Sequence, residues 1–125
     1  MAKIDYTGIT TDQHAVINNI IDCFNFNKVY KHMEHVGWKW LSDEKDRYGN
    51  NIMALPDISE LRQALRRLLV HAFQSVNKLK QEEPDYSGPC YSSCGGFTVY
   101  CWPNDMCQAF FSVTDWWIDP EDLNS

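Results

Sequence analysis

Four of the five cysteines lie close together in the C-terminal third of the chain, a grouping that raises the question of a zinc site. Structural zinc is held in tetrahedral geometry by thiolate and imidazole ligands, which usually come in closely spaced pairs. The spacing here contains no Cys-x-x-Cys pair, and an odd number of cysteines argues against a framework of disulfides. We expect no bound metal and four free thiols that act as small apolar side chains: Cys90, Cys94, Cys101 and Cys107.

A run of serine and glycine at residues 92–96 offers hydroxyl groups and flexible backbone N–H groups of the kind that bind phosphate. Phosphate-binding loops precede a helix, whose N-terminal dipole favours the anion. This run precedes a predicted strand instead. We therefore interpret Gly95 and Gly96 as residues that let the chain bend tightly where the strand begins.

The histidines give little support for catalysis. All four fall in predicted helices, and no local signature pairs any of them with a nucleophilic cysteine: His14, His32, His35 and His71. Isolated helical histidines are mostly solvated or structural. We expect neither an enzymatic activity nor a catalytic cofactor.

Large aromatic side chains are the strongest positive signal in the sequence. They exceed what one small core readily buries, and aromatic rings near a surface tend to anchor partners or stack on ligands. Because successive strand residues point to opposite faces, the last two tryptophans cannot both point inward on a strand. The candidate binding residues of this kind are Trp38, Trp40, Tyr100, Trp102, Phe110, Trp116 and Trp117.

The net charge of −6 is unevenly distributed along the chain. Residues 61–81 contain five basic and no acidic residues, whereas residues 82–125 contain eight acidic and no basic ones. The acidic C-terminal third argues against direct nucleic-acid binding, and the two opposite surfaces are compatible with a symmetric homodimer. Arg62 and Arg66, one helical turn apart, form a candidate clamp for phosphate groups.

Three helices are predicted from apolar periodicity and from residues typical of helix ends. The first covers residues 11–24 and begins with a capping box formed by Thr10 and Gln13. The second is short and ends at Gly37, a residue suited to the left-handed conformation. The third begins with a capping box at Asp57 and Glu60 and carries one apolar stripe to about residue 80.

The predicted strands are shorter. Residues 38–42 and 52–55 have extended patterns on either side of a charged loop, and residues 82–96 are interpreted as a long linker. A three-residue loop at 103–105, with Asp105 left-handed, sets the register of a C-terminal hairpin. One side of this hairpin pairs Cys101 with Cys107, Val99 with Ala109 and Phe97 with Phe111, and the other carries Thr98, Tyr100, Trp102, Gln108, Phe110 and Ser112.

These elements predict one α+β domain over residues 1–125. An N-terminal helical hairpin precedes one long amphipathic helix, which packs on a small antiparallel sheet that includes the C-terminal β-hairpin. No apolar run approaches the roughly 20 residues of a membrane span, and the N-terminal residues lack the apolar segment of a secretory signal. We expect a soluble cytoplasmic protein without a membrane partner.

Three short motifs give the chain a resemblance to a known group of proteins. The motifs are Trp38-x-Trp40, then Pro56 followed by Glu60-Leu61-Arg62, and then Gly95-Gly96-Phe97. Over residues 25–113 the chain resembles small, uncharacterised accessory proteins encoded by tailed bacteriophages and prophages, although Cys94 interrupts their Ser-Gly junction. The resemblance implies no activity. It implies a virus-encoded accessory protein in the cytoplasm of a bacterial host, and many such proteins bind and disable a host component.

Two hypotheses about function follow. The first is a non-enzymatic protein that inhibits a host protein, for example one of an anti-phage defence system, through an acidic and aromatic surface. The alternative is a sponge that sequesters a small nucleotide signalling molecule. In that case Arg62 and Arg66 would hold the phosphates while Trp38, Trp40 or Trp102 stacks on the base.

Overall fold

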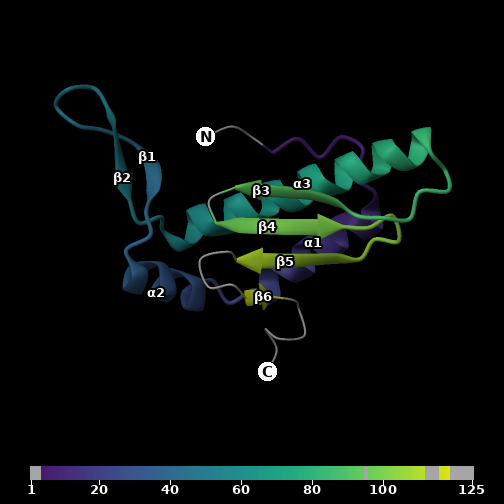
Figure 1. Cartoon of the computed structure of the whole chain (residues 1–125), viewed down its shortest axis with the longest axis horizontal. Coiled ribbons are helices and arrows are strands. Elements are labelled where there is room, and N and C mark those ends of the chain that lie inside the picture. The colour runs from purple at the N-terminus through teal and green to yellow at the C-terminus, as the bar shows by residue number, and fades with distance from the viewer. Residues whose placement is uncertain (1–3, 95, 112–115, 119–125) are drawn as a thin grey trace.

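The computed structural model describes residues 4–94, 96–111 and 116–118, and within them the fold is of the α+β class (Figure 1). The strands form a two-stranded sheet, β1-β2, and a four-stranded antiparallel sheet in the order β3-β4-β5-β6. The elements are α1 (Thr11–Cys23), α2 (Phe26–Val36), β1 (Trp40–Lys45), β2 (Asn51–Ala54), α3 (Ile58–Glu82), β3 (Cys90–Cys94), β4 (Phe97–Cys101), β5 (Cys107–Phe111) and β6 (Trp116–Ile118).

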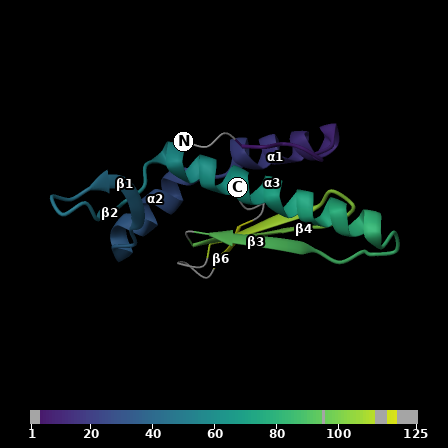
Figure 2. The same cartoon turned by 90° about the horizontal axis from the view of Figure 1, so that it is seen from above.

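Helix α3 lies between α1 and the four-stranded sheet, as Figure 2 shows from above. Its apolar side chains are buried along most of its length, and fully burying a leucine stabilises the fold by about 1.5–3 kcal/mol. They share one core with buried residues of α1, α2, β4 and β5. The buried residues of α3 are Leu61, Leu65, Leu68, Leu69, Val70, Ala72, Phe73 and Val76.

The predicted helix ends are confirmed. The hydroxyl of Thr10 accepts from the Gln13 N–H at 3.1 Å, and the Thr10 N–H donates to the Gln13 side chain at 3.2 Å. Asp57 and Glu60 make the equivalent pair of bonds at the start of α3. Gly37 is left-handed, with a φ of 74°, and ends α2.

The C-terminal hairpin has the register that its sequence predicts. Cys101 is opposite Cys107, and Phe97 is opposite Phe111. The loop between the strands closes through the Trp102 N–H, which donates to the Met106 carbonyl at 2.9 Å. Asp105 takes the left-handed conformation, with a φ of 68°.

Two sequence predictions about loops are wrong in part. Residues 90–94 lie in the predicted linker, yet they form β3, which pairs along its whole length with β4. This segment is short and polar, so its strand conformation depends on the backbone hydrogen bonds that β4 offers rather than on an apolar pattern of its own. The charged loop is also shorter than predicted, because β1 continues to Lys45 and β2 begins at Asn51.

Leu65→Ala is expected to lower the free energy of unfolding by about 2–5 kcal/mol, because the leucine is fully buried and its removal leaves a cavity. Urea denaturation followed by circular dichroism measures this loss. Lys78→Ala on an exposed position of the same helix serves as the control and should change stability by less than about 0.5 kcal/mol. Equal effects of the two substitutions would contradict the central position of α3.

Candidate binding surfaces

Strands β1 and β2 form an arm, residues 40–54, that extends beyond the N-terminal end of α3 and away from the four-stranded sheet (Figures 1 and 2). The turn at its tip is held by Asp46, whose carboxylate accepts from the backbone N–H groups of Tyr48 and Asn50 at 2.8 and 3.0 Å. Gly49 supplies the left-handed residue of this turn. The arm therefore has a defined shape although it lies outside the main core.

Most exposed apolar side chains of the described residues belong to this region. Eight large apolar residues are exposed in the described part of the chain, and six of them fall between residues 36 and 53. Leu41 and Met53 lie directly opposite each other and are 64 % and 53 % exposed. We call the six residues the arm surface: Val36, Trp38, Leu41, Tyr48, Ile52 and Met53.

The two tryptophans predicted to bind a partner have different positions at the base of the arm. Trp38 follows the left-handed Gly37, and its backbone N–H donates to the Met33 carbonyl at 2.9 Å. Its side chain is 41 % exposed. Trp40 is half-buried and meets the ring of Phe97 edge-on, with the ring centroids 6.3 Å apart. Trp38 thus belongs to the arm surface, whereas Trp40 attaches the arm to the core.

A second aromatic surface lies on the face of the four-stranded sheet that α3 does not cover. The ring of Tyr100 lies 6.0 Å from that of Tyr91 and 6.3 Å from that of Trp102. The hairpin register of the sequence predicts this position for Tyr100 and Trp102. It does not predict Tyr91, because the short polar segment 90–94 has no apolar pattern typical of a strand.

The remaining predicted aromatic residues are placed by backbone pairing alone. Phe110 pairs with Thr98 on one side and with Trp117 on the other, and Trp116 pairs with Phe111. The side chains of Phe110, Trp116 and Trp117 lie outside what the structure describes. Their role in binding stays a prediction.

The two arginines of the candidate phosphate clamp contact other side chains of the chain itself. The Arg62 guanidinium lies over the Phe26 ring, 5.5 Å from its centroid. Arg66 donates to the Asn18 side chain at 2.7 Å and to the Tyr6 hydroxyl at 3.4 Å. These contacts place both arginines on the helical side of α3, whereas Trp102 follows β4 on the other side.

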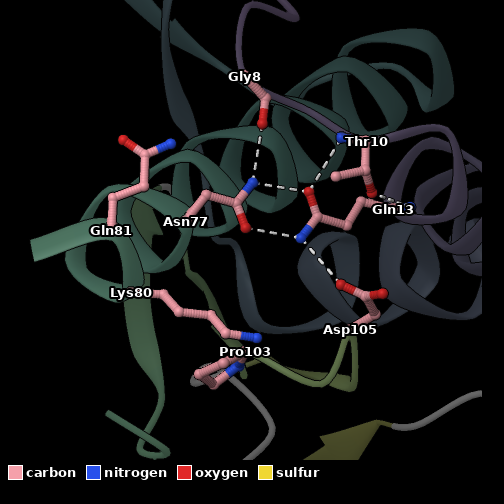
Figure 3. Close-up of a pocket in the computed structure, with 8 residues that line it drawn as sticks. All are labelled: Gly8, Thr10, Gln13, Asn77, Lys80, Gln81, Pro103 and Asp105. Atoms are coloured by element: carbon pink, nitrogen blue, oxygen red, sulfur yellow. Dashed lines mark hydrogen bonds between the residues drawn. The ribbon is translucent and has the colours of Figure 1, made fainter. Parts of the chain in front are cut away.

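A polar hollow of about 400 Å³ lies where the N-terminal segment, α1, α3 and the β4–β5 loop meet (Figure 3). Gln13, only 2 % exposed, donates to Asn77 at 2.8 Å and to the Asp105 carboxylate at 2.9 Å. Asn77 donates back to Gln13 at 2.7 Å and to the Gly8 carbonyl at 2.9 Å. The hollow is lined by Gly8, Thr10, Gln13, Asn77, Lys80, Gln81, Pro103 and Asp105.

These hydrogen bonds occupy the Gln13 amide completely, since its oxygen also accepts from the Thr10 N–H. The Gln13 cluster therefore acts as a structural clamp that joins α1, α3 and the loop after β4. The sequence pattern predicts Gln13 as a capping residue only. Its bonds to Asn77 and Asp105 connect residues far apart in the chain, so no local pattern could reveal them.

The cysteines do not converge in the way that a tetrahedral zinc site requires. Cys90 and Cys107 lie on strands two positions apart, which corresponds to roughly 10 Å across the sheet. Cys94 is exposed at the far end of β3, opposite Phe97. Within residues 4–94, 96–111 and 116–118, no group of three or more histidine, cysteine or acidic side chains is arranged to hold a metal ion.

The serine- and glycine-rich run joins two strands. Cys94 pairs with Phe97, so the turn between β3 and β4 contains only residues 95 and 96, and Gly96 has a φ of 93°. A strand follows the turn, so no helix N-terminus is present to favour a phosphate. For Gly96, the geometry agrees with the interpretation of a tight bend.

Comparison of the chain with protein-family models, with curated proteins and with solved structures gave no significant match. None of the helices in the described part of the chain is long and apolar enough to cross a membrane.

Gln13→Ala is expected to lower the free energy of unfolding by about 1–3 kcal/mol, because Asn77 and Asp105 lose a partner in a partly buried site. Chemical denaturation measures the loss. Gln81→Ala, at an exposed position on the rim of the same hollow, is the matched control and should have almost no effect. An unchanged stability of the Gln13 variant would show that the clamp contributes nothing.

Proposed function

We propose that this protein acts by binding another protein and that the arm surface is the main contact. The observation that carries the proposal is the concentration of exposed apolar side chains between residues 36 and 53. Leu41 and Met53 form a cross-strand pair on one face of the arm, and an exposed apolar patch on a soluble protein usually marks an interaction site. We also propose a non-enzymatic role, because the exposed side chains of the arm surface are all apolar or aromatic and include no acid–base pair or nucleophile that could carry out catalysis.

The arm does not need these apolar side chains for its own folding. Its conformation is supported by the β1–β2 pairing, by the Asp46 turn and by the contact of Trp40 with Phe97. Leu41 and Met53 lie outside the buried core and expose more than half of their surface. A partner that covered this pair would bury apolar area without any rearrangement of the core.

The charges around the arm suit a protein partner better than a nucleic acid. Three basic and three acidic residues are interspersed in the segment 39–47, so this segment is neutral in a chain of net charge −6: Lys39, Asp43, Glu44, Lys45, Asp46 and Arg47. A mixed polar rim around an apolar centre is the usual composition of a protein interface. The Arg47 guanidinium lies over the Tyr48 ring, 4.9 Å from its centroid, which places both at the tip.

The partner that we propose is a host protein in a bacterial cell, which the chain inhibits on binding. The resemblance of residues 25–113 to phage and prophage accessory proteins supports this view. The aromatic surface around Tyr100 and Trp102 would then provide a second contact, together with the acidic C-terminal segment. Of that segment, four acidic residues lie outside the described part of the chain: Asp115, Asp119, Glu121 and Asp122.

The nucleotide sponge receives less support from the geometry. Arg62 and Arg66 already contact Phe26, Asn18 and Tyr6, so binding a phosphate would require these contacts to be exchanged. Trp102 lies on the other side of α3 from both arginines.

The test is affinity capture from bacterial lysate with the wild-type protein and with the double variant Leu41→Ser/Met53→Ser. The wild type should recover a stoichiometric partner. The double variant should capture at least about tenfold less of it, because apolar contacts at the centre of an interface contribute about 2 kcal/mol or more each. The captured protein is then purified, and its activity is measured with and without this chain. Inhibition by the wild type alone completes the test.

Met106→Ser is the control, since Met106 is an exposed apolar position outside both the arm surface and the aromatic surface of Tyr91, Tyr100 and Trp102. This variant should retain the partner, and thermal melting should show that both variants remain folded. Equal capture by all three proteins, recovery of no stoichiometric partner, or recovery of a second copy of this chain as sole partner would each refute the proposal.

A further inference from the structure

Three cysteines form a row across the four-stranded sheet, and the proposed binding function does not use them. Cys90 on β3 is directly opposite Cys101 on β4, and Cys101 is directly opposite Cys107 on β5. The three strands are neighbours in the sheet (Figure 1). All three side chains pack against the hydrophobic core, so they share the face that α3 covers.

The two pairs in this row differ in geometry. The Trp102 N–H donates to the Met106 carbonyl, so the adjoining pair of Cys101 and Cys107 is a non-hydrogen-bonded pair of the antiparallel ladder. Side chains are closest in such pairs, where the Cα atoms lie about 4.5 Å apart. A disulfide spans Cα separations of about 4.4–6.8 Å. Cys101 and Cys107 are therefore already placed for a bond between their sulfurs.

The second pair is less favourable. In an antiparallel sheet a residue directs both backbone hydrogen-bonding groups to the same neighbouring strand, so Cys101 forms its hydrogen-bonded pair with Cys90. The Cα atoms of such a pair lie about 5.5 Å apart, and the side chains diverge. Cys107 is thus the preferred partner of Cys101.

Accessibility and hydrogen bonding give the two thiols of the closer pair different roles. Cys101 is fully buried, and its sulfur lies 3.9 Å from the Leu69 carbonyl oxygen. The hydrogen bond to Cys107, and then burial, raise the pKa of the Cys101 thiol well above its usual range. Cys107 is only half-buried. An external reagent therefore meets Cys107 first, while Cys101 stays protonated behind it.

We propose that Cys107 and Cys101 form a thiol–disulfide exchange site for small disulfides of the glutathione type. The Cys107 thiolate attacks one sulfur of the disulfide, the sulfur–sulfur bond breaks, and one glutathione leaves as a thiolate that takes up a proton. Cys101 then attacks the Cys107 sulfur in the mixed disulfide. The second glutathione leaves as a thiolate and takes up the Cys101 proton, and a Cys101–Cys107 disulfide remains.

The reaction is balanced without a further oxidant. Two protein thiols become one disulfide, and one glutathione disulfide becomes two molecules of glutathione. Because the bond joins residues that are already opposite, the register of β4 and β5 does not change. The oxidised hairpin keeps Asp105 within reach of the Gln13 clamp, so oxidation leaves the fold intact.

The experiment incubates the folded, reduced protein with glutathione disulfide, quenches with acid and alkylates the remaining thiols. Cleavage after aromatic residues and before Asp105 places Cys90, Cys94, Cys101 and Cys107 on separate peptides, and mass spectrometry identifies linked peptides. The expected product is a protein lighter by two hydrogen atoms in which Cys101 is linked to Cys107. Cys101→Ala should stop at the mixed disulfide on Cys107, which adds the mass of one glutathione.

Cys94→Ala is the matched control, because Cys94 is exposed and lies outside the row. This variant should form the Cys101–Cys107 disulfide at the wild-type rate. The proposal is overturned if wild-type Cys101 and Cys107 stay alkylatable while Cys94 acquires glutathione, or if Cys90 replaces Cys107 in the linked peptide. Circular dichroism of each reduced variant shows whether that variant is folded. If a variant unfolds, the disulfide-linked peptides of the wild-type protein alone decide the proposal.

Discussion

The structure depends on the burial of the apolar side chains of α3, which pack against helices on one side and against the four-stranded sheet on the other. A single helix of 25 residues faces α1 and α2 on one side and the sheet on the other, so its leucines and Phe73 are shared by both layers. This explains why a small sheet with polar edge segments can form at all. Strand β3 is held because it pairs with β4 at one edge of the sheet and packs against α3. The loop after β4 is tied to α1 and α3 through the Gln13 clamp.

The same constraint leaves two surfaces that α3 does not cover. One helix can cover only one face of the four-stranded sheet, so Tyr91, Tyr100 and Trp102 remain on the open face. The arm extends past the N-terminal end of α3, and only its base, through Trp40, reaches the core. The arm surface is thus a direct consequence of where the central helix begins.

The chemical role of the cysteines depends on which side chains the packed sheet places beside them. In the sequence, the cysteines are small apolar residues with unsuitable zinc spacing. The sheet aligns three of them at equivalent positions of neighbouring strands and excludes a common tetrahedral metal because the outer two lie far apart. The alignment also brings Cys101 and Cys107 into contact, and this contact creates a reactive pair from residues that look inert one at a time.

Local sequence patterns were sufficient to predict the features that depend on neighbouring residues. The capping boxes at Thr10 and Asp57, the left-handed Gly37 and the hairpin register set by Asp105 are all confirmed, because each follows from bonds within a few residues. Only the tertiary structure decided that residues 90–94 form a strand, that Arg66 contacts α1 and that Trp40 anchors the arm. These features depend on partners distant in the chain, whose backbone groups and side chains become neighbours only after the core has formed.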